Sequence, residues 1–193
     1  FKISISGTGA DEIFTGYYDH HLFYLSSIFK YDNLYKSSKK NWKKNIFPIV
    51  RNNYLKDPDI FIKDPKFRDH IYSGKDFIKY LKIPFYEKFI EKEYSTSLLR
   101  NRMLNELFEE VVPIILCEDD LNSMSHSIEN RSPFLDRNLF EATLKFPTKH
   151  LVQNGKAKYI LRESMRNIVP NSILDNYNKV GFNAPVEDLV DFN

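Results

Sequence analysis

The feature that most constrains the fold is a single strand-like segment at the start of an otherwise helical sequence. Residues 1–5 are rich in β-branched side chains and end at Ser6-Gly7-Thr8-Gly9, which predicts a strand followed by a glycine-containing loop. No other convincing strand pattern follows. Because a lone strand cannot form a sheet, we expect its partners to come from residues before Phe1 or from a second copy in a homodimer, and its edge to be exposed. The sequence therefore predicts a mainly α chain with one N-terminal strand.

The start of the chain bears on domain organisation. No initiator methionine precedes a strand that is already in progress at Phe1, so we expect a piece of a longer protein. The sequence shows no repeat with a period of 20–50 residues, which disfavours a solenoid. With 193 residues, of which 42% are apolar, the chain is long enough to bury one core of ordinary size.

Helical patterns account for most of the remaining sequence. Helices are predicted at residues 10–14, 17–30, 36–50, 96–129, 137–145 and 155–168. Pro113 is expected to kink the 96–129 segment or to start its second helix, and Pro133 to end it. Short helices and loops are expected between residues 54 and 95, and a loop with a terminal helical turn after Lys179.

Charge and cysteine content exclude several classes of protein. Lys and Arg number 28 against 26 Asp and Glu, so no nucleic-acid partner is predicted. The five lysines between residues 36 and 44 are either a solvated helix face or a phosphate-binding patch. No apolar stretch reaches the roughly 18 to 20 residues of a membrane span. Cys117 stands alone, which excludes an intramolecular disulfide and favours a reducing, cytoplasmic compartment, with Cys117 as a small core residue.

The first segment suited to chemistry is the loop at residues 6–9 and the helix start that follows it. Backbone N–H groups at such a turn suit an anion such as phosphate. The carboxylates of Asp11 and Glu12, just inside the helix, could hold Mg²⁺. A tight turn before a charge-capped helix explains the same residues without any ligand, and both interpretations remain open.

The second segment runs from Asp119 to Asp136 and is rich in small hydroxyl side chains. It holds Glu129 and Arg131, which would not face each other on a continuous helix, so that either could point into a cleft. Helix caps and surface charges are the alternative.

The third segment combines Gly155–Arg162 with a later loop at residues 179–182. Lys158 and Lys179 could neutralise a leaving pyrophosphate as point charges, or could simply be solvated. The five histidines show no HExxH motif, so catalytic zinc is not expected.

Taken together and in this order, the three segments resemble the synthetase domain of the glutamine-dependent asparagine synthase family. SGTGADEIFTGY at residues 6–17 is similar to the family's S-G-E-G-(A/S)-D-E-(L/V)-F-x-G-Y. DDLNSMSHSIENRSPFLD at residues 119–136 is similar to E-D-R-x-S-M-A-x-S-x-E-x-R-x-P-F-L-D. GKAKYILR at residues 155–162 and KVGF at residues 179–182 match G-K-x-K-x-x-L-R and K-x-G-F.

The resemblance implies that residues 1–193 are the C-terminal portion of an α/β PP-loop ATP pyrophosphatase domain, which is adenine nucleotide alpha hydrolase-like. It implies ATP-dependent amidation of a small-molecule carboxylate through an acyl-adenylate, with glutamine-derived ammonia as the nucleophile and ATP and Mg²⁺ as cofactors. The residues carried over are Ser6, Gly7, Thr8 and Gly9 for the nucleotide, Asp11 for Mg²⁺, Glu129 beside the adenylate, and Lys158 and Lys179 for the phosphates.

Departures from the family pattern limit what the resemblance implies. Thr8 replaces a glutamate that is thought to contact the acyl-adenylate or to take a proton from ammonia, and a hydroxyl cannot act as that base near neutral pH. Aspartate is then in doubt as the substrate, and other carboxylates such as sugar acids become candidates. Leu121 also replaces a usual arginine.

Two parts of the family are absent from the sequence, namely its first phosphate loop, S-G-G-x-D-S, and its N-terminal glutaminase. We therefore expect the isolated chain to bind ATP poorly and to show no synthetase turnover. A β-lactam synthetase-like intramolecular amide closure and a non-catalytic helical interaction module stay open as alternatives.

Overall fold

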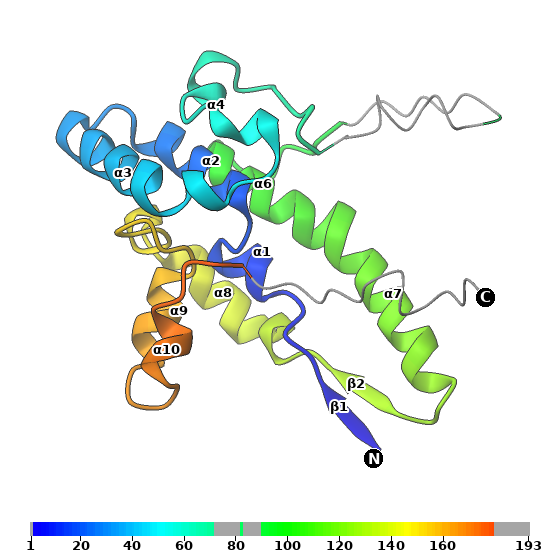
Figure 1. The fold of residues 1–193 in the computed structure, drawn as a ribbon. Helices are drawn as coiled ribbons and strands as arrows, with labels where there is room; N and C mark the ends of the chain where they lie inside the picture. The colour runs from blue at the N-terminus through cyan, green and yellow to red at the C-terminus, as the bar shows by residue number, and fades with distance from the viewer. Residues whose placement is uncertain (1, 72–81, 83–89, 180–193) are drawn as a thin grey trace, which may run out of the picture.

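The computed structural model describes residues 2–71, 82 and 90–179 (Figure 1). Its strands and helices are β1 (Ile3–Ile5), α1 (Ala10–Phe14), α2 (Tyr18–Ile28), α3 (Asp32–Asn45), α4 (Ile60–Lys63), α6 (Leu98–Asn105), α7 (Val111–Met124), β2 (Glu129–Arg131), α8 (Arg137–Lys145), α9 (Tyr159–Ser164) and α10 (Asn171–Leu174). The prediction of a mainly α chain that begins with a strand is confirmed. None of the helices in the described part is long and apolar enough to cross a bilayer.

The first strand has a partner within the chain, which corrects the expectation that it would be unpaired or paired only with another molecule. β1 and β2 form a parallel pair in which Ile3 lies opposite Glu129 and Ile5 lies opposite Arg131 (Figure 1). The pairing continues past the strand ends, because the Ser6 N–H donates to the Arg131 carbonyl at 2.8 Å. The sequence pattern missed β2 because its three residues are all polar and show no alternation.

The long helical segment predicted at residues 96–129 is divided in two. A π-helical turn at Glu106–Glu110 separates α6 from α7. Pro113 is the third residue of α7 and follows the π-helical turn directly, as expected of a proline that kinks this segment or begins its second helix. The predicted end of that helix at Pro133 is wrong, because the helix stops at Met124 and β2 follows.

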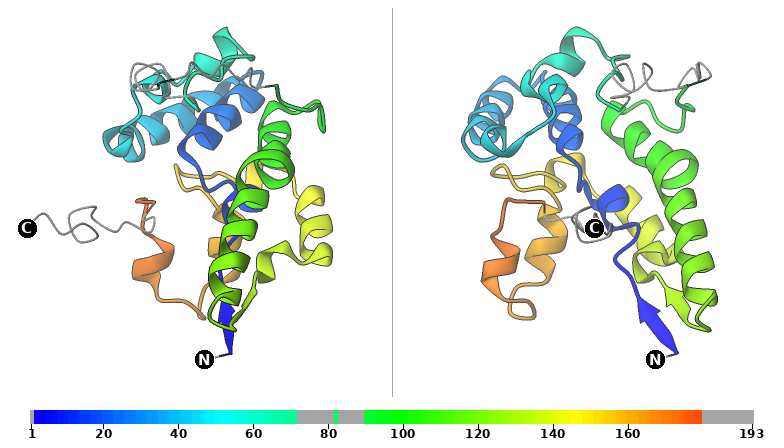
Figure 2. Two further views of the ribbon diagram at one scale, coloured as in Figure 1. Left: turned by 90° about the vertical axis from the view of Figure 1, so that its right-hand side faces the viewer. Right: turned by 45° about the vertical axis from the view of Figure 1, so that its right-hand side comes forward.

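The apolar residues form two clusters, and Ile160 of α9 packs against both. The larger one joins α2, α3, α4 and α6, and includes the stacked rings of Phe23 and Phe61, whose centroids lie 3.7 Å apart. The smaller one packs Ile13 and Phe14 of α1 against Leu107 and Val112. Helix α1 also contacts α6, α8 and α9, and therefore lies at the junction of the described helices (Figure 2). This packing fixes the helix that follows the glycine-containing loop.

Three further predictions fall on the described residues. Cys117 is exposed and is not a core residue, because it lies on the solvent side of α7. Four of the five lysines between residues 36 and 44 are exposed, which a solvated face and a phosphate-binding patch both allow, while Lys39 binds Asp59 at 2.5 Å. The helix predicted at residues 155–168 is limited to α9. The loop and terminal turn predicted after Lys179 lie outside the described residues.

Candidate functional site

The glycine-containing loop packs against the second motif segment on one side and is open on the other. The Ser6 hydroxyl donates to Thr8 Oγ1 at 3.0 Å and lies 3.0 Å from Ser132 Oγ, just after β2. Gly9 has a left-handed φ of 92°, and a Cβ atom there would lie 2.4 Å from a Leu135 methyl group. At Gly7, in contrast, nothing lies within 4 Å of where a Cβ would be, so a ligand can approach the backbone there.

The carboxylate of Asp11 gathers both predicted lysines. Lys158 Nζ lies 2.6 Å from Asp11 Oδ1, and Lys179 Nζ lies 3.6 Å from Asp11 Oδ2. Burial raises the pKa of the Asp11 carboxyl, but the two ammonium groups lower it by more, so that its pKa lies below the usual value. A Cβ at Gly16 would fall 1.5 Å from Asp11 Oδ1, so the glycine leaves the space that this carboxylate fills.

A strained turn brings Lys158 to Asp11. Thr15, at the end of α1, is fully buried and has a φ of 68°, which is unusual for a β-branched residue. Its hydroxyl donates to the Leu151 carbonyl at 3.1 Å and accepts the Lys158 N–H at 3.4 Å. Lys158 itself has a φ of 55°, which is why α9 begins only at Tyr159. The end of α1 and the start of α9 are therefore fastened together beside Asp11.

The segment that carries Lys179 is held by contacts of its own. Lys156 Nζ binds Asp175 at 2.6 Å and also lies 5.5 Å from the centroid of the Tyr177 ring. Further along, Lys179 Nζ lies over the ring of Tyr17, at 3.6 Å from its centroid. The chain after α10 is thereby directed back to α1.

A cavity of about 170 Å³ opens beside Asp11. Four cationic side chains and one carboxylate line it, so the charged groups of its wall sum to +3; they are Lys156, Lys158, Arg162, Lys179 and Asp11. Burial lowers the pKa of Arg162, which donates to the Ala157 carbonyl at 2.8 Å and to the Leu174 carbonyl at 2.8 Å. An excess of positive charge in a small cavity favours a compact polyanion.

The donor set fits both groups that the resemblance implies. Mg²⁺ in nucleotide sites is commonly bound by one or two carboxylates and by phosphate oxygens, and Asp11 offers one half-buried carboxylate beside two lysines that suit phosphate. Asp11 would hold the metal ion, while Lys158 and Lys179 would bind the phosphate oxygens. The open backbone at Gly7 leaves room for the nucleotide.

Glu129, the other predicted catalytic residue, lies away from this cluster. It is the first residue of β2, whereas the loop begins beyond the last residue of β1. Its exposed carboxylate pairs with the guanidinium of Arg131. The two side chains meet because residues two apart in a strand share a face, which a helix would not allow. The predicted contact of Glu129 with an adenylate stays a prediction.

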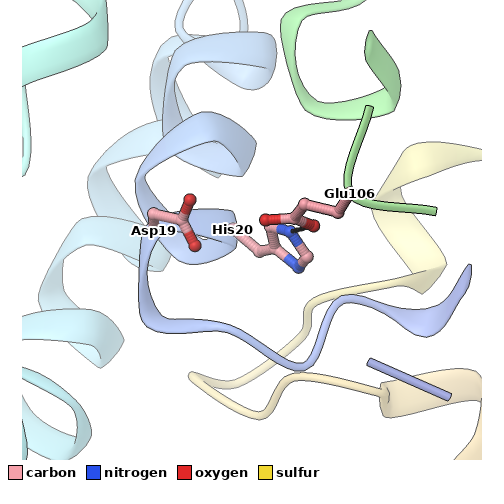
Figure 3. Close-up of side chains that lie close together, drawn as sticks. All are labelled: Asp19, His20 and Glu106. Atoms are coloured by element: carbon pink, nitrogen blue, oxygen red, sulfur yellow. Dashed lines mark hydrogen bonds and ion pairs between the residues drawn. The ribbon is translucent and has the colours of Figure 1, made fainter. Parts of the chain in front are cut away.

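A second group of charged side chains lies buried behind the site. Asp19, His20 and Glu106 each offer a possible metal ligand, and these ligand atoms lie within 4.8 Å of one another (Figure 3). His20 Nε2 is 2.6 Å from Glu106 Oε2. Arg102 Nε lies 3.0 Å from Glu106 and 3.6 Å from Asp19, and Arg102 also binds Glu110 at 2.8 Å. We call these five residues the buried cluster.

Arg102 already supplies the cation that these carboxylates need. Burial raises the pKa of Asp19, but its hydrogen bond from His70 and the charges of His20 and Arg102 lower it by more, so Asp19 is ionised. Burial lowers the pKa of His20, but Glu106 and Asp19 raise it by more. All three possible ligands are fully enclosed. The buried cluster is therefore an enclosed network of paired charges, in which Arg102 and His20 face the carboxylates, rather than a metal centre.

A larger hollow of about 1020 Å³ lies elsewhere, between the end of α2 and the start of α6. Its wall mixes serine, threonine and apolar side chains with Lys30, Asp32 and Lys149. No carboxylate among the residues of this wall gathers two cations, as Asp11 does. The smaller cavity is accordingly the better candidate for a site.

Sequence reasoning missed several residues that build the site. Gly16 and Tyr17 stand in the motif segment at residues 6–17, so their positions were available as a signal. Thr15 occupies a variable position of the same motif, and nothing in the sequence marks it. Asp175 lies outside the three segments altogether.

Comparisons with known proteins agree with these observations. A family model described as asparagine synthase matches residues 1–193. "Asparagine synthetase [glutamine-hydrolyzing] 1" of Bacillus subtilis (strain 168) is 27% identical over 210 aligned residues, which cover 95% of this chain and 31% of that protein. A "Putative asparagine synthetase [glutamine-hydrolyzing]" of Mycobacterium bovis is 33% identical over 81 residues, which cover 42% of this chain and 12% of that protein. The chain thus spans about a third of the length of the Bacillus relative. No solved structure gives a significant match.

Proposed function

The chain belongs to the asparagine synthase family, and from that premise we propose that it forms the pyrophosphate-binding part of an ATP-dependent enzyme that amidates a carboxylate. The observation that carries the proposal is the cavity beside Asp11, in which Lys158 and Lys179 meet one carboxylate. Pyrophosphate is a compact polyanion of the kind that this wall favours. The relatives' printed names support the amidation and glutamine as the ammonia source.

The proposed reaction has two steps, and the residues of this chain act mainly in the first. The carboxylate of the substrate attacks the α-phosphorus of ATP, and the bond to the β-phosphate breaks to release pyrophosphate. Lys158 and Lys179 neutralise the charge that develops on this leaving group, and such preorganised charges act without reorganising during the reaction. Ammonia then attacks the acyl carbon, AMP leaves, and the nitrogen loses a proton.

The contacts of the two lysines with Asp11 explain how they could act in the release of pyrophosphate. With one carboxylate between them, the ammonium groups of Lys158 and Lys179 stay close together despite their repulsion. Mg²⁺, when bound, supplies further positive charge at the phosphates. Asp11 would then turn from the lysines to the metal ion, and the lysines would be free for the phosphate oxygens. The site thus starts with one carboxylate that partly balances two lysines, an arrangement that an incoming anion can replace.

We further propose that the substrate is a carboxylate other than aspartate. The support is the Thr8 hydroxyl, which accepts a hydrogen bond from Ser6 at 3.0 Å and cannot take a proton from ammonia near neutral pH. Sugar acids are the leading candidates. AMP release by the complete gene product should be measured with aspartate and with a series of uronic acids, and turnover of aspartate alone would overturn this part of the proposal.

The role of Glu129 is tested in the complete gene product. Glu129→Gln should lower AMP release by about 100-fold or more, the size of effect expected for a group that acts at the reacting centre. The matched control is Glu141→Gln, which breaks a comparable exposed ion pair with an arginine on α8 and should leave AMP release unchanged. Full activity of Glu129→Gln would remove Glu129 from the site, and equal losses in both variants would point to a general effect on folding.

A further inference from the structure

Tyr17 lies between the open site and the buried cluster and touches both. It stands between α1 and α2, and its phenol O–H donates to the carboxylate of Glu12, which is itself buried. Its backbone N–H donates to His20 Nδ1 at 3.4 Å, and its ring meets the His20 ring edge-on, with centroids 5.2 Å apart at 75°. Three contacts therefore fix the orientation of the Tyr17 ring: the hydroxyl bonds to Glu12, the backbone N–H bonds to His20, and the ring packs against the His20 ring.

One face of the fixed ring carries a cation. Lys179 Nζ lies 3.6 Å from the ring centroid, well inside the roughly 6 Å within which a cation–π attraction acts. The other group near this ammonium is the Asp11 carboxylate, at 3.6 Å. Neither contact alone would hold a flexible lysine side chain, which loses up to about 2 kcal/mol of rotamer entropy on ordering. Together, the ring below and the carboxylate beside it define one position for the ammonium.

The rigidity of the ring depends on the buried cluster. His20, which contacts the Tyr17 backbone and ring, is bound to Glu106 at 2.6 Å and is fully buried. Burial and the bond to Glu12 raise the pKa of Tyr17 far above its usual value, so the phenol stays neutral and keeps donating its proton.

We propose that Tyr17 is a positioning residue. Its ring is a fixed aromatic platform that holds the Lys179 ammonium beside Asp11, at the cavity of about 170 Å³ that Lys179 lines. The role of Lys179 in binding pyrophosphate rests on the proposed function, but the positioning of Lys179 by the Tyr17 ring does not. Tyr17→Phe keeps the ring and should keep the lysine in place, whereas Tyr17→Leu removes the platform and should release it.

Nuclear magnetic resonance of the chain with ¹³C in the lysine ε position tests the platform without any reaction. Protons close to the face of an aromatic ring are shifted upfield, so the ε signal of Lys179, whose Nζ lies 3.6 Å from a ring centroid, should be displaced further in the wild type than those of Lys30 and Lys156, at 5.2 and 5.5 Å. Its disappearance in Lys179→Arg assigns it. The shift should persist in Tyr17→Phe and be lost in Tyr17→Leu. The matched control is Tyr31→Leu, since Lys30 lies over that exposed ring at 5.2 Å, and this variant should leave the Lys179 signal unchanged.

Two outcomes would overturn the platform. One is a wild-type spectrum with no displaced signal that vanishes in Lys179→Arg, a result that needs no Tyr17 variant to fold. The other is a displaced signal that survives in a folded Tyr17→Leu.

A titration with Mg²⁺ and inorganic pyrophosphate then tests separately whether Lys179 binds pyrophosphate. The Lys179 signal should move on addition, and Tyr17→Leu should bind about fivefold more weakly. A ring-shifted signal that pyrophosphate does not move would uphold the platform and overturn the proposed function of the lysine.

Discussion

The two groups of charged side chains beside Tyr17 are the buried cluster and the open site around Asp11. They contain similar side chains but differ in burial and in the balance of their charges. In the buried cluster, Arg102 lies among carboxylates that are enclosed and fully paired. In the open site, Asp11 is outnumbered by cations, and each of the three partners keeps roughly a quarter to a third of its side chain exposed. Removing one partner from an enclosed ion pair destabilises the fold, whereas an excess of positive charge beside a cavity favours binding of an anion.

The difference separates residues that matter for folding from those that matter for binding. A substitution in the buried cluster leaves an unpaired charge that water cannot reach, so its effect falls on stability. A substitution in the open site changes the charge presented to a ligand, while water can solvate what is left. This distinction would be wrong if substitutions in the buried cluster and in the open site had the same effects on stability and on ligand binding.

The largest effect is expected from Arg102→Met. Removing this cation leaves the enclosed carboxylates of Asp19 and Glu106 with histidine partners alone, and breaking a buried ion pair in this way costs about 3 to 5 kcal/mol of unfolding free energy. Urea denaturation followed by circular dichroism measures the loss.

Arg137→Met is the matched control for Arg102→Met. It breaks an ion pair with Glu141 whose arginine side chain is 88% exposed, and such surface pairs contribute about 0 to 1 kcal/mol. If the two variants were equally stable, the buried cluster would not be the structural network that we describe.

A smaller effect, on binding rather than on folding, is expected from Lys158→Met. Loss of this ammonium should weaken binding of Mg²⁺-pyrophosphate about tenfold, which corresponds to about 1.4 kcal/mol. Unfolding free energy should change by less than about 1 kcal/mol, because Lys179 still faces Asp11. Isothermal titration calorimetry and urea denaturation give the two quantities, with the exposed Lys149→Met as the control. Unchanged affinity together with a large loss of stability would reverse the assignment of this lysine.

The smallest effect is a dependence of the unfolding free energy on pH. The adjacent residues His20 and His21 change this free energy in opposite directions as the pH falls. Burial and the nearby His20 charge lower the pKa of His21 to about 3, so the unfolded chain binds a proton below about pH 6.5 that the folded chain does not. The pKa of His20 is raised, so its contribution is complete below about pH 6.5 and is lost as the pH rises through the folded value.

Stability should therefore be greatest near pH 6.5. Unfolding free energy should be roughly 1 kcal/mol lower at pH 5, as the sum of the two opposing histidine contributions. His21→Gln should flatten the acid side of the profile and leave the alkaline side in place. Denaturant titrations from pH 5 to pH 8.5 test this. A wild-type profile that is level between pH 5 and pH 6.5 would contradict a neutral, buried His21.

Much of the open site could be predicted from the sequence, and the buried cluster could not. Asp11, Lys158 and Lys179 lie in motif segments whose order marks them, although only the fold shows that they meet. Arg102 and Glu106, by contrast, are charged residues four apart in a helical pattern, which normally indicates a solvated face. Their burial depends on α2 packing against α6, a tertiary contact that no local pattern encodes.

The fold was predicted best where a local amphipathic pattern decides the structure and worst where a distant contact does. The amphipathic pattern at α8 predicted its bounds correctly. β2 exists because β1 lies beside it, not because its residues favour a strand. α9 starts late because the bond between Thr15 and Lys158 holds the backbone in a left-handed turn. In both places a tertiary interaction overrides the local preference.

The π-helical turn at Glu106–Glu110 makes chain length as strict a requirement as residue identity in this part of the molecule. Such a turn accommodates one extra residue within a helix. Deleting a single residue there would restore a regular α-helix, but would rotate everything beyond it by about 100°. Val112 would then turn away from α1, and β2 would lose its alignment with β1. Homologous sequences that keep this structure should therefore keep the length of this helix as well as the charges of Arg102 and Glu106, and an alignment gap within it would signal a different structure.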